Sequence, residues 1–251
     1  MNPRILAATT GRILRQLRHD RRTVALLVVV PALLLTLLYF MFADLPTPPG
    51  QPNPFDRVAL VMLGVFPFVV MFLVTSIAML RERTTGTLER LLTTPLSRLD
   101  LLFGYGIAFG LAAAVQAAVA ATVAYLLFGL ETAGSTGLVI VIAVVNAVLG
   151  VALGLFCSAF ARTEFQAVQF MPVVVVPQIL LCGLFVARDQ MADWLRVVSD
   201  VLPLSYAVEA LQEVGAHPEP TGLMWRDLAV VAGAVVVALV LAAATLRRRT
   251  G

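Results

Sequence analysis

The amino-acid sequence predicts an all-α integral membrane protein with six membrane-spanning helices. Hydrophobic residues make up 60% of the 251 residues and charged residues only 13%, whereas soluble domains average about 25% charged residues. The mean hydropathy is +0.93. A helix needs roughly 20 apolar residues to cross a hydrocarbon core of about 30 Å, and lipid offers no partner for free backbone N–H groups, so apolar segments of this length should be helices. Six segments qualify: 23–43, 58–80, 101–128, 136–160, 168–187 and 228–246.

The residues before the first span, 1–22, are basic and amphipathic. Apolar residues recur among the arginines at roughly helical spacing: Ile5, Leu6, Ile13, Leu14 and Leu17. This pattern favours a helix lying in the membrane interface; the alternative is a solvated basic tail that only sets the topology. The apolar run that follows is too long for a signal-peptide core and has no clear cleavage site, so we expect no cleavable signal.

The arginines set the orientation of the spans. All 18 basic residues are arginine, and fourteen of them lie in 1–22, 81–100, 161–167 and the tail 247–251. The loops on the other side, 44–57, 129–135 and 188–227, hold four. Because positive charge accumulates on the cytoplasmic side, we expect both termini and the segment 81–100 in the cytoplasm. Six spans, an even number, agree with that placement.

Prolines and cysteines add two local expectations. The stretch MPVVVVPQ, residues 171–178, predicts a kink or break in the fifth span, because a proline frees a backbone carbonyl within a helix. Cys157 and Cys182 lie in apolar runs without a partner pattern of cysteine or histidine. We therefore expect neither a disulfide nor a metal site.

The charged segment 81–100, RERTTGTLERLLTTPLSRLD, lies between two apolar runs. Each of its charges would cost roughly 2.5–3.5 kcal/mol at the bilayer centre, so the segment must be outside the hydrocarbon. Gly86 interrupts the chain, Thr87 can cap a helix, and Glu89 falls in its first turn, where the helix dipole favours an acid. Pro95 ends the helix.

Leu88, Leu91 and Leu92 form one apolar face on this predicted two-turn helix. A helix so short is marginal alone in water. The face either docks on a partner or folds back on the protein's own membrane helices, and the residues alone leave both alternatives open.

The run from Arg81 to Ser97 resembles the cytoplasmic loop of ABC-2-type transporter permeases, with an acidic–basic pair, Gly-Thr-Leu-Glu, a short leucine helix and a following proline. Pro203-Leu204-Ser205-Tyr206, followed by Glu209-Ala210-Leu211, resembles the family's pattern before the last span. The order of the elements matches as well. Within the family, the sequence is most similar to daunorubicin/doxorubicin resistance-type efflux permeases.

The resemblance implies a type V exporter-like permease fold in the bacterial cytoplasmic membrane. It implies two permease chains, as a homodimer or with a paralogous permease, and a separate ABC ATPase that binds ATP and Mg. It also implies short re-entrant helices in 188–227. The residues that match the family's ATPase-coupling loop are Glu82, Arg83, Gly86, Thr87, Leu88, Glu89, Leu91 and Pro95.

The chain shows no GxxxxGK[ST], HExxH or GxSxG motif. We therefore expect a transport subunit that is not an enzyme, with no cofactor of its own and no nucleic-acid partner. No acid, arginine or histidine falls in the middle of a span, which argues against a proton-coupled carrier.

Small and polar residues within the spans predict helix packing or a substrate path. Two ridges recur every four residues, Gly106-Gly110-Ala114 and Asn146-Gly150-Gly154-Ser158, and pack either within one chain or between two. Polar candidates for a substrate path, or for bonds between helices, are Gln116, Asn146, Gln169, Gln178 and Tyr206. Glu209 and Glu213 are expected to be solvated; the alternative is that they gate release.

The function that the sequence predicts is therefore export of a lipophilic or amphipathic molecule, such as a drug, an antibiotic or a lipid-like compound. Export of a glycolipid or polysaccharide by the same machinery is one alternative. The other, from a different class, is a membrane anchor or signalling protein with no solute path.

Overall fold

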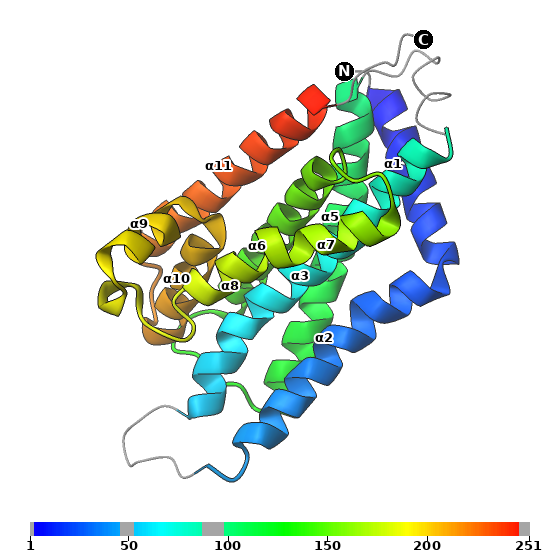
Figure 1. The fold of residues 1–251 in the computed structure, drawn as a ribbon. Coiled ribbons are helices and arrows are strands. Elements are labelled where there is room, and N and C mark those ends of the chain that lie inside the picture. The colour runs from blue at the N-terminus through cyan, green and yellow to red at the C-terminus, as the bar shows by residue number, and fades with distance from the viewer. Residues whose placement is uncertain (1–2, 46–52, 87–97, 246–251) are drawn as a thin grey trace.

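The computed structural model describes residues 3–45, 53–86 and 98–245, and every regular element within these ranges is a helix (Figure 1). The prediction of an all-α protein with six apolar helices long enough to span a membrane is confirmed. These six are α2 (Arg21–Phe42), α3 (Pro54–Thr84), α5 (Arg98–Thr122) with its π-helical continuation η1 (Val123–Leu127), α6 (Thr136–Cys157), α7 (Glu164–Val174) with α8 (Val176–Leu181), and α11 (Gly222–Thr245).

The remaining helices lie at the two ends of the bundle. The first, α1 (Pro3–His19), lies at the same end as the C-terminal part of α11 (Figure 1). At the other end of α11 are α9 (Asp193–Val201) and α10 (Pro203–Ala216), preceded by the short helix η2 (Arg188–Gln190). The helix expected before the first span is thus present; its position in the membrane interface stays a prediction.

The core is built around α3 and α6, which make the most extensive helix–helix contact. A Cβ atom added to Gly150 would lie 2.3 Å from the carbonyl oxygen of Phe68, and one added to Gly154 would lie 2.5 Å from that of Phe72. Asn146 donates its amide to the Gly64 carbonyl at 2.9 Å. The second predicted ridge therefore packs within the chain, and only glycine permits so close an approach.

The first ridge is packed less tightly. A Cβ added to Gly106 would lie 4.0 Å from Leu239 of α11, and one added to Gly110 would lie 3.5 Å from Val148 of α6. Both are ordinary van der Waals distances. These two glycines also face neighbours in the same chain, but nothing in their surroundings requires glycine.

The fifth span is broken, as the prolines predict. Helix α7 ends at Val174 and α8 begins at Val176, with Pro172 inside α7 and Pro177 in the first turn of α8. The helix starts at Glu164, earlier than residue 168, because Thr163 caps it by accepting a hydrogen bond from the Gln166 amide at 3.2 Å. It stops at Leu181, short of residue 187, and the chain then turns at Gly183, whose φ of +91° suits glycine.

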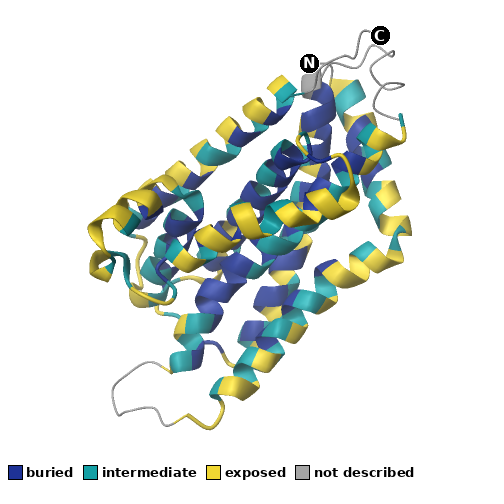
Figure 2. Cartoon of the chain, in the orientation of Figure 1, coloured by how far each residue is buried: buried dark blue, intermediate teal, exposed yellow. Residues whose placement is uncertain are grey.

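Burial separates the inner helices from the outer ones. Helices α3 and α6 are mostly buried, whereas α2, α7 with α8, and α11 present large apolar side chains outward (Figure 2). Such a surface suits lipid or a second membrane subunit. Cys157 and Cys182 are buried and are not joined to each other.

Candidate functional site

Three helices meet in a polar contact where α3 ends. Arg12 of α1 pairs with Glu82 of α3, with 3.1 Å between Nη1 and Oε1, and its Nη2 donates to the Tyr105 hydroxyl of α5 at 3.4 Å. We call these three residues the clasp. The Glu82 side chain is 12% exposed and that of Arg12 28% exposed. Because both charges are largely withdrawn from water, their attraction is stronger than that of a surface pair.

Close packing holds α1 at this position. A Cβ added to Gly104 would lie 2.7 Å from Cγ2 of Thr9, so α1 rests directly on the backbone of α5. Ile13 adds a buried side chain to the same contact region. The residue before Glu82, Arg81, forms a 2.7 Å ion pair with Glu164 of α7. The end of α3 is thereby tied to α1, α5 and α7.

The structure describes three of the eight residues predicted for the coupling loop. Glu82 belongs to the clasp, and the guanidinium of Arg83 is largely buried, with no hydrogen-bond partner for Nε or Nη2 among the described residues. Gly86 follows α3 with a φ of +71°, the turn expected there. The other five, Thr87, Leu88, Glu89, Leu91 and Pro95, lie outside the described residues. The resemblance implies that Glu82 belongs to the ATPase-coupling loop. In the structure, its carboxylate pairs with Arg12 of the same chain.

The predicted polar path residues do not form one cluster. Asn146 bridges α6 to α3, and Gln178 bridges α8 to α10, since its Oε1 accepts from the Leu204 amide at 3.4 Å. Gln169 is exposed on α7. Gln116 is buried in α5, and neither atom of its amide has a hydrogen-bond partner within the described ranges. Asn146 and Gln178 thus form hydrogen bonds between helices, which is one of the two roles expected for the four amides; the other is to line a substrate path.

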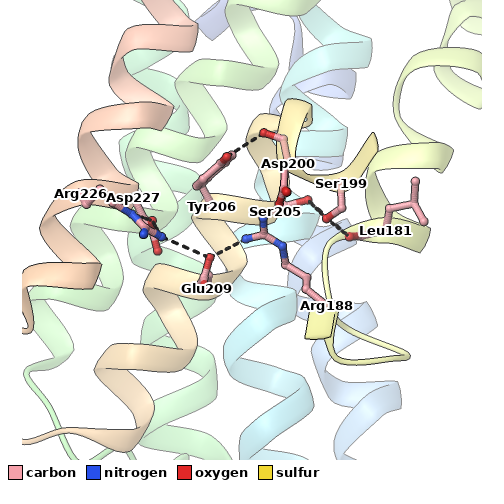
Figure 3. Close-up of polar contacts among 9 residues, drawn as sticks. All are labelled: Leu181, Arg188, Ser199, Asp200, Ser205, Tyr206, Glu209, Arg226 and Asp227. Carbon is pink, nitrogen blue, oxygen red and sulfur yellow. Dashed lines mark hydrogen bonds and ion pairs between the residues drawn. The ribbon is translucent and has the colours of Figure 1, made fainter. Parts of the chain in front are cut away.

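Tyr206 belongs to a second polar cluster (Figure 3), which lies at the end of the bundle that holds α9 and α10 (Figure 1). Its centre is Arg188, which pairs with Asp200 of α9 and, through Nη1 at 2.5 Å, with Glu209 of α10. The Arg188 guanidinium lies 5.1 Å from the centre of the Tyr206 ring, within the range of a cation–π contact. The Tyr206 hydroxyl donates to the Asp200 carbonyl at 2.7 Å. We call this set the Arg188 cluster.

The Arg188 cluster extends to the first turns of α11. Arg226 lies 3.8 Å from Glu209 and donates to Asp227 from Nε and Nη2, at 2.9 and 2.8 Å. The Asp227 side chain is fully buried. A buried carboxylate needs a charged partner to offset the loss of hydration, and Arg226 supplies it. Glu209 thus stands between two arginines and links α10 to both η2 and α11.

Two serine hydroxyl groups add hydrogen bonds beside the Arg188 cluster. Helix α8 ends at Leu181, so its carbonyl has no partner in the next turn. Ser199 donates to that carbonyl at 2.8 Å, and Ser205 lies 3.0 Å from Ser199 (Figure 3). The broken span, α9 and α10 are therefore joined by hydrogen bonds as well as by charge.

The surroundings of Glu209 are only partly aqueous. Burial raises the pKa of Glu209, the neighbouring Asp227 raises it further, and Arg188 and Arg226 act in the opposite direction. Glu213 is half-buried and accepts a 2.7 Å hydrogen bond from Thr221. The expectation that Glu209 and Glu213 are simply solvated was wrong. The short helices expected in 188–227 are present, and α10 is buried against α3, α6 and α11.

Sequence patterns missed both clusters because their members are far apart in the chain. Arg12 and Glu82 are 70 residues apart, and Arg188 and Glu209 are 21 apart. Neither separation leaves a periodic signal. One signal was available. An arginine that lies among acidic residues, in a loop that also holds three short helices, is a candidate ion-pair partner for those acids.

A polar pocket of about 710 Å³ adjoins the Arg188 cluster. Arg57 and Arg196 also line it, and neither forms an ion pair within the described ranges 3–45, 53–86 and 98–245. The pocket can offer cationic and hydrogen-bonding groups to the polar part of a molecule at this end of the bundle. The contacts of the cluster join η2, α9, α10 and α11 to one another.

Comparison with known proteins identifies the family. Residues 4–214 match the family model of the ABC-2 type transporter. The chain is 28% identical over 170 residues to the probable multidrug ABC transporter permease YbhS of Escherichia coli, which covers 67% of this chain and 45% of YbhS. It is 26% identical over 138 residues to the linearmycin resistance permease protein LnrN of Bacillus subtilis, covering 55% of this chain and 36% of LnrN.

A third relative, ABC transporter G family member 20 of Dictyostelium discoideum, is 26% identical over 171 residues, or 67% of this chain and 23% of that protein. The matches span less than half the length of each of these three relatives. The family match, by contrast, covers most of this chain. The protein is therefore a membrane-spanning permease of the ABC-2 type transporter family.

Proposed function

We propose that the protein is the transmembrane subunit of an ATP-driven exporter that moves a lipophilic or amphipathic molecule out of the cell. The observation that carries the proposal is the family match across residues 4–214. Relatives named as multidrug and linearmycin resistance permeases support a small amphipathic substrate over a polysaccharide. Permeases of this family work with an ABC ATPase subunit, and we assign ATP and Mg binding to that partner.

In this proposal the segment 81–100 transmits the motion of the ATPase. Its predicted helix carries the apolar face formed by Leu88, Leu91 and Leu92. The end of α3, from which the segment continues, is fixed to α1, α5 and α7 by the clasp and by the pair of Arg81 with Glu164. A force applied to the segment therefore reaches several membrane helices at once.

The outward apolar faces of α2 and α11 support a further part of the proposal, a second permease copy or a paralogous permease in a bacterial cytoplasmic membrane. The distribution of arginines supports cytoplasmic termini. This orientation places the clasp on the cytoplasmic side and the Arg188 cluster on the outer side.

Co-purification with a candidate ABC ATPase from the same genome tests the proposal. The two proteins are co-expressed, isolated through a tag on the permease and reconstituted, and ATP hydrolysis is measured across a panel of lipophilic compounds. We expect a stable complex whose hydrolysis rises with some of the compounds. An ATPase that neither associates nor responds to any compound would favour the membrane-anchor alternative and contradict the proposal.

A further inference from the structure

A pocket of about 690 Å³ lies between α1, α2, α3 and α5, at the end of the bundle that holds the clasp. Pockets that bind drug-sized molecules measure roughly 300–1,000 Å³. Two of the three clasp residues, Glu82 and Tyr105, form part of its wall. We call it the inner pocket. It is separate from the Arg188 cluster and shares no lining residue with the outer polar pocket.

The part of the inner pocket that lies farther from the ends of the helices is lined by apolar side chains. Leu26 of α2, Ile77 of α3 and Phe109 of α5 contribute to it. Ile77 lies seven residues before Thr84, the last residue of α3, which corresponds to about 10 Å along the helix at 1.5 Å per residue. Phe109 lies 11 residues after Arg98, the first residue of α5, or about 16 Å. The predicted spans end at residue 80 and begin at residue 101, so Ile77 lies about 5 Å and Phe109 about 12 Å inside the hydrocarbon, within the half of it that measures about 15 Å.

The mouth of the inner pocket carries both signs of charge. Arg22 and Arg81 supply cations, and Asp20 and Glu82 supply carboxylates. Three of these four are already oriented inside the chain. Asp20 accepts from the Thr23 hydroxyl at 2.6 Å, Glu82 pairs with Arg12, and Arg81 pairs with Glu164.

The fourth charge, that of Arg22, is exposed and forms no ion pair within the part of the chain that the structure describes. A headgroup with only one sign of charge would meet a like charge at this mouth as well as an opposite one. A zwitterionic headgroup finds an opposite charge for each of its ends.

The side of the inner pocket is open to the surroundings of α2. Leu26 lines the pocket and is 54% exposed. A molecule with an apolar tail can therefore reach the pocket from the cytoplasmic leaflet without passing through water. Glu82 and Thr85 in the pocket wall lie four residues and one residue before Gly86, where the chain leaves α3 for the segment proposed to contact the ATPase.

We propose that the inner pocket is an access site for the substrate, where the chain takes up a zwitterionic amphiphile from the cytoplasmic leaflet. The charged mouth holds the headgroup, and the apolar part between α2, α3 and α5 holds the tail. This inference rests on the proposed function of export and deepens it by naming the class of substrate. Occupancy of the site changes the surroundings of Glu82 and Thr85, next to the segment that we assign to the ATPase.

The probe for this site is lysophosphatidylcholine with a photoactivatable diazirine in its acyl chain. The full chain, alone and with its ATPase, is placed in phosphatidylglycerol nanodiscs so that the bulk lipid does not share the zwitterionic headgroup. After irradiation, mass spectrometry locates the labelled residues. We expect labels on residues that line the inner pocket from α2, α3 and α5, and competition by unlabelled lysophosphatidylcholine about tenfold better than by lysophosphatidylglycerol.

Filling the pocket provides the matched test. Leu26→Trp should reduce this labelling about tenfold, whereas Leu33→Trp should leave it unchanged, because Leu33 lies on the same face of α2, is 53% exposed and does not line the pocket. Ile77→Trp fills the pocket from α3 and should reproduce the effect of Leu26→Trp. Gel filtration of each variant shows that the fold is kept.

Three results would overturn the assignment: labels outside the pocket, equal labelling in the Leu26→Trp and Leu33→Trp variants, or equal competition by the two lysolipids. The labelling is read directly from the permease, whereas the proposed function is read from association with the ATPase and from stimulated hydrolysis. Selective labelling without an ATPase response would contradict the proposed export function but support the assignment of the inner pocket as a binding site. Stimulated hydrolysis without selective labelling would contradict the site alone.

Discussion

At the scale of single residues, the strictest limits on side-chain size lie where the backbones of two helices touch. Gly150 and Gly154 let α6 approach the carbonyls of Phe68 and Phe72 so closely that even a methyl group has no space. Asn146 adds a hydrogen bond along the same line. Since lipid supplies no hydrophobic force between membrane helices, this contact depends on close packing and polar bonds.

Gly150→Ala should therefore destabilise the protein. The added methyl group meets the Phe68 carbonyl oxygen at 2.3 Å, and overpacking of this kind costs about 1–3 kcal/mol. The control is Gly233→Ala in α11, where a Cβ would meet nothing within 4 Å and alanine gains helix propensity of up to about 1 kcal/mol. Thermal unfolding in detergent should show a lower midpoint for Gly150→Ala only. Equal midpoints would show that α3 and α6 are not in close contact.

The acidity of Glu209 gives a second prediction at this scale. Burial and Asp227 raise its pKa above the ordinary value, and in the unfolded chain it returns to that value. The folded protein thus keeps a proton that the unfolded chain has lost. The resulting stabilisation is full below the unfolded pKa and disappears as the pH rises through the folded pKa.

Glu209→Gln, which imitates the protonated acid, should remove this dependence. The thermal midpoint of the natural protein, minus that of Glu209→Gln, should fall as the pH rises from acidic values toward neutrality. Glu219→Gln, at an exposed position between α10 and α11, is the control and should give a flat difference. If the difference in thermal midpoint for Glu209→Gln stayed flat or rose with pH, the two arginines would lower the pKa of Glu209 at least as much as burial raises it.

At the scale of elements, the clasp decides how α1 is attached. Arg12 reaches from α1 to the end of α3 and the first half of α5, and Thr9 packs on Gly104. A helix attached this firmly moves with α3. The basic N-terminal segment is thus part of the bundle and does more than set the topology.

A charge exchange measures this attachment. Arg12→Glu and Glu82→Arg should each lower the thermal midpoint, because each leaves two like charges facing one another in a poorly hydrated contact. The double variant should recover part of the loss, with a coupling energy of about 1–3 kcal/mol.

The pair of Arg81 with Glu164 is the matched control for the clasp, since the two side chains are 57% and 53% exposed. Its exchange should give a coupling energy between 0 and about 1 kcal/mol. If the two pairs gave the same coupling energy, the clasp would be no more than a surface contact.

At the scale of the whole molecule, local features of the sequence predicted the architecture. The six spans follow from apolar length, and the break near Val175 follows from Pro172 and Pro177, because both effects act within one helix. The residues that join the spans were not predictable in this way. Arg188 finds Asp200 and Glu209 only after the segment following α8 has folded back on α10, and Glu82 finds Arg12 only after α1 has packed on α5.

Together, the spans and the two polar clusters form a bundle whose helices are joined by ion pairs at both ends. The clasp joins α1, α3 and α5 at one end, and the Arg188 cluster joins η2, α9, α10 and α11 at the other. Between them, α3 runs through the core and packs on α6, which in turn packs on α11. This arrangement offers a mechanical connection between the segment 81–100 and the opposite end of the molecule.

Substrate-stimulated ATP hydrolysis by the complex of the permease with its ATPase tests the coupling role most directly, using the double variant Leu88→Asp/Leu91→Asp. Thr93→Asp/Ser97→Asp, which adds the same charge to the same segment without removing its leucines, is the control. We expect the leucine variant to be inserted in the membrane but to lose stimulation, while the control keeps it. Unchanged stimulation in the leucine variant would contradict the account of 81–100 as the element that connects this permease to its ATPase.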